Sequence, residues 1–205
     1  MLKCALCGIR ACDGMDESRY PAGCPSREDM TDIRQAYLTE EDFRFGQVCS
    51  EVSMSKQGPR PRILELIEVA QKCGYHKLGL AFCVGFANEA KLLTQVLEHW
   101  GFEVVSVICK VGGIDKDLHG IENGGNAMCN PIAQAHLLNE AKTDFNIALG
   151  LCVGHDSLFF RHSAAPVTVM ATKDKVLAHN PMGALYVSDG YYKNILFPEN
   201  PGKLG

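Results

Sequence analysis

The chain has 205 residues, which suits one domain of roughly 100–200 residues with an additional segment. With 46% hydrophobic and 21% charged residues, its composition is that of an ordinary soluble globular protein. A net charge of −4 gives no electrostatic reason to bind nucleic acid or an anionic membrane, and no apolar run approaches the ~20 residues that cross a bilayer. The amino-terminal residues lack the apolar core of a signal peptide, so we expect a cytoplasmic protein.

Ten cysteines are the most unusual feature of the composition. In a reducing compartment this number indicates metal binding or thiol chemistry more than structural disulfides. Free cysteine can also be a small buried hydrophobe, and this plainer interpretation applies best to Cys73, and with less force to Cys49.

Residues 1–26 form a cysteine-rich head with the spacing C-x2-C-x4-C-x11-C, made by Cys4, Cys7, Cys12 and Cys24. The segment is too short to bury its own core, and ligand bonds to a metal can supply the missing folding free energy. Four thiolates suit a tetrahedral zinc ion, with an iron–sulfur cluster as the alternative. A redox dithiol at the first pair, or cysteines without a ligand, also stays open.

Two helices are expected between residues 28 and 57, the second capped by Thr39 and opened by acidic residues. The sequence Gln-Gly-Pro-Arg-Pro at 57–61 then interrupts the chain. The predicted organisation is therefore a metal-binding head with helices over residues 1–57 and an α/β domain over residues 58–205.

From residue 62 onward, apolar runs alternate with amphipathic segments. Strands are predicted at 78–83, 102–109, 145–152, 167–172 and, as a short fifth strand, 176–178. Helices are predicted from Arg62 to Cys73, from 88 to 100, after Asn130-Pro131, from an Asp156 cap to His162, and after Asn180-Pro181. The inward faces are expected to include Leu92, Leu93, Val96 and Leu97 in one helix and Ile132, Ala135 and Leu138 in the next. This alternation predicts a Rossmann-like, three-layer α/β fold with a parallel sheet.

Three of the predicted strands end in a cysteine: Cys83, Cys109 and Cys152. Ligands of open parallel sheets bind outside the carboxyl ends of the strands, so these thiols should lie at one edge. Cys129 comes just before a predicted helix and should join them. Helix amino termini stabilise thiolates, and the four cysteines are therefore predicted to bind a second metal, a cluster or another cofactor, or to carry out thiol redox chemistry.

His155 follows Cys152 by three residues in the sequence Cys-Val-Gly-His-Asp-Ser. It could bind a metal, accept a proton or only pack within the loop. The candidates for a catalytic role are Cys83, Cys152 and His155, although no Ser/His/Asp or paired-carboxylate arrangement assigns a reaction. Whether the protein is an enzyme is left open at this point.

The head cysteines, together with the sequences Phe-Cys-Val-Gly, Met-Cys-Asn-Pro and Cys-Val-Gly-His-Asp-Ser, resemble an uncharacterised prokaryotic family. Its members are described as candidate metal-binding proteins with a domain of unknown function. The resemblance covers nearly the whole chain and implies a zinc-type site at the head cysteines. It implies nothing about the cysteines at the sheet edge.

The leading hypothesis is a cytoplasmic metal-binding protein with one sulfur site in the head and a second at the sheet edge. A non-catalytic module that senses or carries metal, or a zinc-stapled interaction module, is the alternative. The expected partners are a metal ion and a small molecule or redox partner, and neither nucleic acid nor a membrane is expected.

Overall fold

The computed structural model describes residues 3–54, 58, 60–121, 127–199 and 201–202. The chain divides into two compact units, Met1–Lys56 and Gln57–Gly205. The sequence placed the division between residues 57 and 58. No helix among the described residues is both long enough and apolar enough to cross a membrane.

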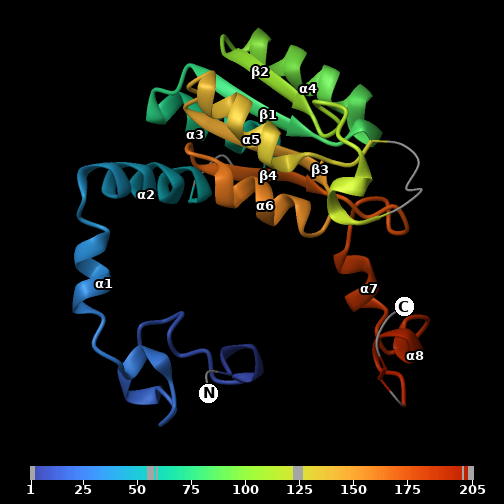
Figure 1. The fold of residues 1–205 in the computed structure, drawn as a ribbon. Coiled ribbons are helices and arrows are strands. Elements are labelled where there is room, and N and C mark those ends of the chain that lie inside the picture. Colours follow the sequence, from blue (N-terminus) through green and yellow to red (C-terminus); the bar gives the residue numbers. More distant parts are fainter. Residues whose placement is uncertain (1–2, 55–57, 59, 122–126, 200, 203–205) are drawn as a thin grey trace. The chain divides into compact units, whose positions relative to one another are not determined.

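The first unit holds short 3-10 turns followed by two helices (Figure 1). The turns are Cys4–Leu6, Glu17–Arg19 and Pro25–Arg27, and the helices are α1 (Thr31–Ala36) and α2 (Glu40–Ser53). Thr39 caps α2 as expected, because its side chain accepts a hydrogen bond from the amide of Asp42 at 3.3 Å.

The second unit is built on four strands, β1 (Lys77–Phe82), β2 (Glu103–Ile108), β3 (Phe145–Leu151) and β4 (Val167–Thr172). All neighbouring strands are parallel, and their order is β2-β1-β3-β4. The helices are α3 (Arg62–Cys73), α4 (Ala87–His99), α5 (Pro131–Glu140), α6 (His155–His162), α7 (Met182–Tyr186) and α8 (Lys193–Leu196).

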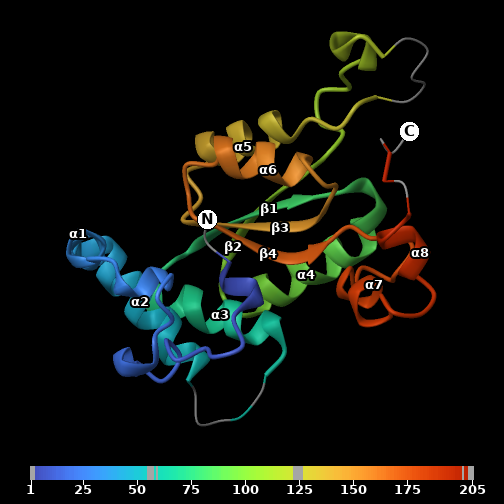
Figure 2. The ribbon, with the colours of Figure 1, turned by 90° about the horizontal axis from the view of Figure 1, so that it is seen from below.

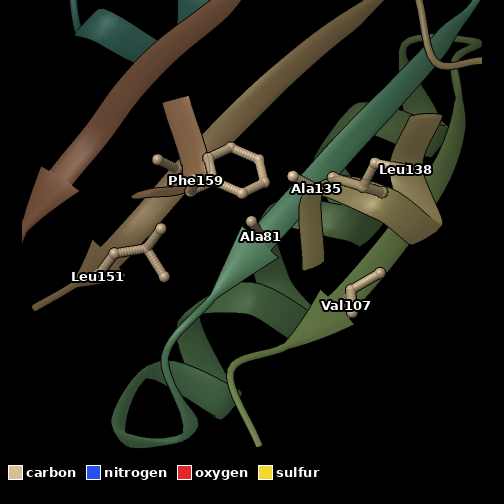
Figure 3. Close-up of a cluster of buried hydrophobic side chains, with 7 residues drawn as sticks. Ala81, Val107, Ala135, Leu138, Leu151 and Phe159 are labelled. Atoms are coloured by element: carbon tan, nitrogen blue, oxygen red, sulfur yellow. The ribbon is translucent and has the colours of Figure 1, made fainter. Parts of the chain in front are cut away.

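Helices cover both faces of the sheet, with α5 and α6 on one face and α3 and α4 on the other (Figure 2). The fold is therefore the predicted Rossmann-like, three-layer α/β architecture. Its packing beneath α5 and α6 is shown in Figure 3, where Phe159 of α6 and Leu138 of α5 meet Ala81 of β1. Every residue of β3 is buried, because this strand is internal to the sheet and covered on both faces.

Two helix faces differ from the prediction. Leu92 is 62% exposed, because α4 turns Ala90, Leu93 and Leu97 toward the sheet instead. On α5, Ile132 is 45% exposed, whereas the polar Gln134 is completely buried.

Gln134 is buried because its side-chain amide has backbone partners at the strand ends. Its Nε2 donates to the carbonyl oxygens of Val107 at 2.7 Å and Phe82 at 3.3 Å. These bonds satisfy Nε2, whereas Oε1 is buried and finds no partner among the described residues. Apolar periodicity could not show this, since it assigns polar residues to the surface.

The predicted fifth strand at 176–178 is wrong: these residues form a turn. The Asp174 carboxylate accepts the amide hydrogens of Val176 and Leu177, which bends the chain back on itself. Ala178 and His179 then adopt positive φ angles of 49° and 63°.

The predicted cap of α6 is also wrong. Asp156 was expected to precede this helix, but Gly154 holds the cap position and Asp156 lies in the first turn.

Gly79 lies where β1 passes closest to a buried polar side chain. A Cβ atom there would lie 1.9 Å from Oδ1 of Asn146, which faces it on β3. Asn146 cannot move freely, because it hydrogen-bonds to Thr143 at 2.7 Å and to Ser163 at 2.8 Å.

We expect Gly79→Ala to lower the free energy of unfolding by roughly 1–3 kcal/mol or more through overpacking. Chemical denaturation of the purified chain measures this change. Gly202→Ala is the control, since a Cβ atom there meets nothing within 4 Å. Equal stability of the two variants would contradict the described packing.

Candidate functional site

The candidate site lies at the carboxyl edge of the sheet. The chain passes from β1 to β2 on one side and then returns to place β3 on the other side of β1. Such a reversal leaves a crevice outside the strand ends, where α/β proteins bind ligands. Cys83 directly follows β1, and Cys152 directly follows β3.

Cys83 is paired with Lys173, the residue that directly follows β4. The ammonium of Lys173 donates to its sulfur at 2.8 Å, and the amide of Gly85 lies 3.5 Å from the same sulfur. Burial is the largest single influence and raises the pKa of Cys83. Lys173, the Gly85 amide and the Cys109 thiol together outweigh burial, so the pKa lies below the ordinary thiol value.

Cys109 is as buried as Cys83, but its pKa is shifted in the opposite direction. Both side chains are only 2% exposed. Burial raises the pKa of Cys109 to about 11, helped by the neighbouring sulfurs of Cys129 and Cys83 and opposed by the Val84 amide. That amide donates to the Cys109 sulfur at 3.3 Å. Adjacent strands are therefore followed by one thiol whose pKa is lowered and one whose pKa is raised.

Cys129 and Cys152 complete the group, and both are half-buried. Cys129 interacts with Cys109, and Cys152 accepts a hydrogen bond from Lys173. Pairing with Cys83, and then with Cys152, raises the pKa of Lys173 and keeps it charged. The five side chains thus form a continuous series from Cys129 through Cys109, Cys83 and Lys173 to Cys152. The structure brings together the four thiols that the sequence assigned to this edge.

A ring contact holds the lysine segment against the cysteine segment. Phe86 lies three residues after Cys83 and packs on His179, with ring centroids 4.4 Å apart. His179 in turn closes the turn after Lys173, since it pairs with Asp174 through its backbone amide and its Nδ1. Phe86 lies directly against Gly150 of β3, where a Cβ atom would be 2.1 Å from the ring.

His155 is the first residue of α6, and its amide bonds to the carbonyl of Cys152 at 3.0 Å. Its Nδ1 atom is buried and finds no hydrogen-bond partner in the part of the chain that the structure describes. A catalytic or ligand role for His155 stays a prediction.

The head cysteines gather only in part. Cys4, Cys7 and Cys24 line one pocket of about 300 Å³, whose lining does not include Cys12. The backbone amides of Arg10 and Ile9 donate to the sulfur of Cys7 and lower its pKa. Thiols with backbone amide contacts are the donor chemistry that a structural zinc ion uses. Across residues 3–54, 58, 60–121, 127–199 and 201–202, however, no three Cys, His, Asp or Glu side chains are arranged to hold a metal ion.

The functional residue that sequence reasoning missed is Lys173. The sequence Lys-Asp-Lys at 173–175 reads as a solvent-exposed turn, and its composition gives no sign of a buried partner. The strand-end rule that located the cysteines applies equally to the fourth strand, whose last residue is Thr172. Applied there, the rule would have placed Lys173 at the same edge.

Fold and site together define a parallel α/β protein with a lysine-paired cysteine among clustered thiols at the carboxyl edge of its sheet. The chain belongs to the family described as "Protein of unknown function (DUF1847)", whose model matches residues 24–170. It is also similar to the uncharacterized protein MJ0455 of Methanocaldococcus jannaschii. The two are 42% identical over 200 residues, which cover 95% of this chain and 98% of that protein. The family resemblance inferred from the cysteine motifs is thereby confirmed.

Proposed function

We propose that the sheet edge is a thiol redox site in which Cys83 and Cys109 alternate between a dithiol and a disulfide. The observation that carries this proposal is the unequal pair of neighbouring thiols, one stabilised as thiolate by Lys173 and the other held protonated. A nucleophilic thiolate beside a protonated partner is the arrangement that thiol–disulfide exchange requires.

The strand register supports a direct bond between the two sulfurs. Cys83 and Cys109 directly follow the register pair Phe82–Ile108 on adjacent parallel strands. Neighbouring strands lie about 4.8 Å apart. This spacing falls within the roughly 4.4–6.8 Å that disulfides span between Cα atoms. The bond can therefore form with little movement of the backbone.

The reaction balances with a small disulfide as the oxidant. The two protein thiols lose two electrons and two protons and form one S–S bond. The small disulfide takes up both electrons and both protons and leaves as two thiols.

The lysine charge at the edge makes a metal cation a poorer fit there than a dithiol, because an ammonium beside Cys83 repels a cation. A reducing compartment keeps a chain with ten cysteines in the thiol form from which this reaction starts, and we therefore propose the cytoplasm.

A redox titration in glutathione buffers tests whether Cys83 and Cys109 form a reversible disulfide. The full chain is equilibrated, unreacted thiols are alkylated, and the disulfide is located by peptide mass spectrometry. We expect a Cys83–Cys109 bond, with Cys49 and Cys73 reduced throughout. Disulfides that join other cysteines, with these two left as thiols, would contradict the proposal.

A second function, a structural zinc ion in the head, is favoured by the pocket that Cys4, Cys7 and Cys24 line and by the amide contacts of Cys7. With Cys12, these residues would hold the ion, with an iron–sulfur cluster as the alternative occupant. The ion would supply folding free energy and no chemistry at the edge. A head folded around such an ion would also suit a protein that senses or carries metal, or one that uses the head as a docking surface.

For the head we expect about one metal equivalent in anaerobically purified protein, lost in Cys7→Ser because a zinc ion of this kind needs four ligands. Elemental analysis with an optical spectrum measures the content and separates zinc from iron. Cys49→Ser, a half-buried thiol of the same unit, should retain the metal. Equal metal content in the two variants would refute a head site.

A further inference from the structure

Cys129 stands apart from the proposed couple in its access to solvent. Cys83 and Cys109 are each 2% exposed, so a bulky disulfide cannot approach either sulfur directly. Cys129 is only half-buried and interacts with Cys109. It is the more accessible of the two thiols that Cys109 contacts.

Backbone and side-chain hydrogen bonds fix the Cys129 segment to the residues after β2. The amide of Asn130 donates to the carbonyl of Cys109 at 2.7 Å, and its side chain donates to the carbonyl of Val111 at 3.3 Å. On the other side, the Lys110 ammonium donates to the carbonyl of Ala127. The cysteine between these contacts is held beside Cys109 and is not left to sample many positions.

We propose that Cys129 is the entry thiol for the buried couple and accepts oxidation from low-molecular-weight disulfides such as glutathione disulfide. This inference rests on the proposed redox function of Cys83 and Cys109. Cys129 reacts first with the small disulfide, and the disulfide bond then passes to the buried pair, Cys83 and Cys109.

The relay has three exchanges. The Cys129 sulfur attacks the small disulfide, forms a mixed disulfide and releases one small thiol. The Cys109 thiol then loses its proton to the departing small thiolate as its sulfur attacks Cys129, which forms a Cys109–Cys129 bond and releases the second small thiol. Finally, the Cys83 thiolate attacks Cys109, forms the Cys83–Cys109 bond and returns Cys129 to a free thiol. Each step breaks one S–S bond and forms one. The proton of Cys109 and one proton from solvent, because Cys83 reacts as the thiolate, balance the two small thiols that are released.

The test follows disulfide formation in the reduced full chain after addition of glutathione disulfide, with timed alkylation and peptide mass spectrometry. We expect Cys129→Ser to slow formation of the Cys83–Cys109 bond at least tenfold while reaching the same final state. In Cys83→Ser, the Cys109–Cys129 disulfide should accumulate. Cys49→Ser, a half-buried cysteine outside the edge, should react at the wild-type rate.

The possible failures are distinguishable. A wild-type rate in Cys129→Ser, or no Cys109–Cys129 bond in Cys83→Ser, overturns the relay and leaves the couple standing. Failure of the wild-type chain to form a Cys83–Cys109 bond under excess oxidant overturns the proposed function itself.

Discussion

Replacing Gly150 with alanine is expected to lower the free energy of unfolding of the α/β unit by roughly 2–5 kcal/mol. The residue has a φ angle of +65° inside a buried strand, and an added Cβ atom would overlap the Phe86 ring at 2.1 Å. Phe86 is itself buried, with only 5% of its surface exposed. Its displacement would also loosen the contact with His179 that holds the lysine segment in place.

Chemical denaturation of Gly150→Ala measures this loss, and Gly154→Ala is a matched control. Gly154 has a φ angle of +85°, but a Cβ atom there meets nothing within 4 Å. The control therefore carries the backbone strain without the overlap, and we expect it to cost about 1–2 kcal/mol. If both variants lose the same stability, the Phe86 contact is not what requires glycine at this position.

Replacing Lys173 with methionine is expected to make the Cys83–Cys109 couple easier to oxidise. The ammonium stabilises the Cys83 thiolate, which exists only in the reduced state, so its removal raises the pKa of Cys83 and weakens the reduced form. We expect the equilibrium constant for oxidation by glutathione disulfide at neutral pH to rise about tenfold, which corresponds to a potential lower by about 30 mV.

The redox titration in glutathione buffers measures this shift. Lys173→Arg keeps the charge and should restore most of the wild-type equilibrium. Lys175→Met removes an exposed positive charge from the same turn and should leave the equilibrium unchanged. An unchanged potential in Lys173→Met would show that the lysine does not stabilise the thiolate.

The sequence was sufficient for the fold and for the gathering of the cysteines because both follow from periodicity and chain direction. Alternating strands and helices fix a parallel sheet, and a parallel sheet places all strand ends at one edge. The positions of Cys83, Cys109 and Cys152 therefore followed from the ends of three apolar runs.

The remaining features depend on contacts that periodicity does not encode. Gln134 is buried through hydrogen bonds to two carbonyl groups, and Lys173 is half-buried through its thiol partners. In both cases a polar side chain is stabilised by a specific neighbour from a distant part of the chain. The same limit applies to Phe86, whose ring lies against Gly150 of β3 and beside His179.

The central claim is that the pKa of Cys83 lies below the ordinary thiol range, and a difference titration tests it most directly. The ultraviolet absorbance of thiolate is followed against pH for the reduced wild-type chain and for Cys83→Ser. We predict that the wild-type curve contains two thiols that ionise below the ordinary range, Cys7 and Cys83, and that only one of them remains in the variant. Curves that differ only by a thiol ionising at or above that range would contradict the account.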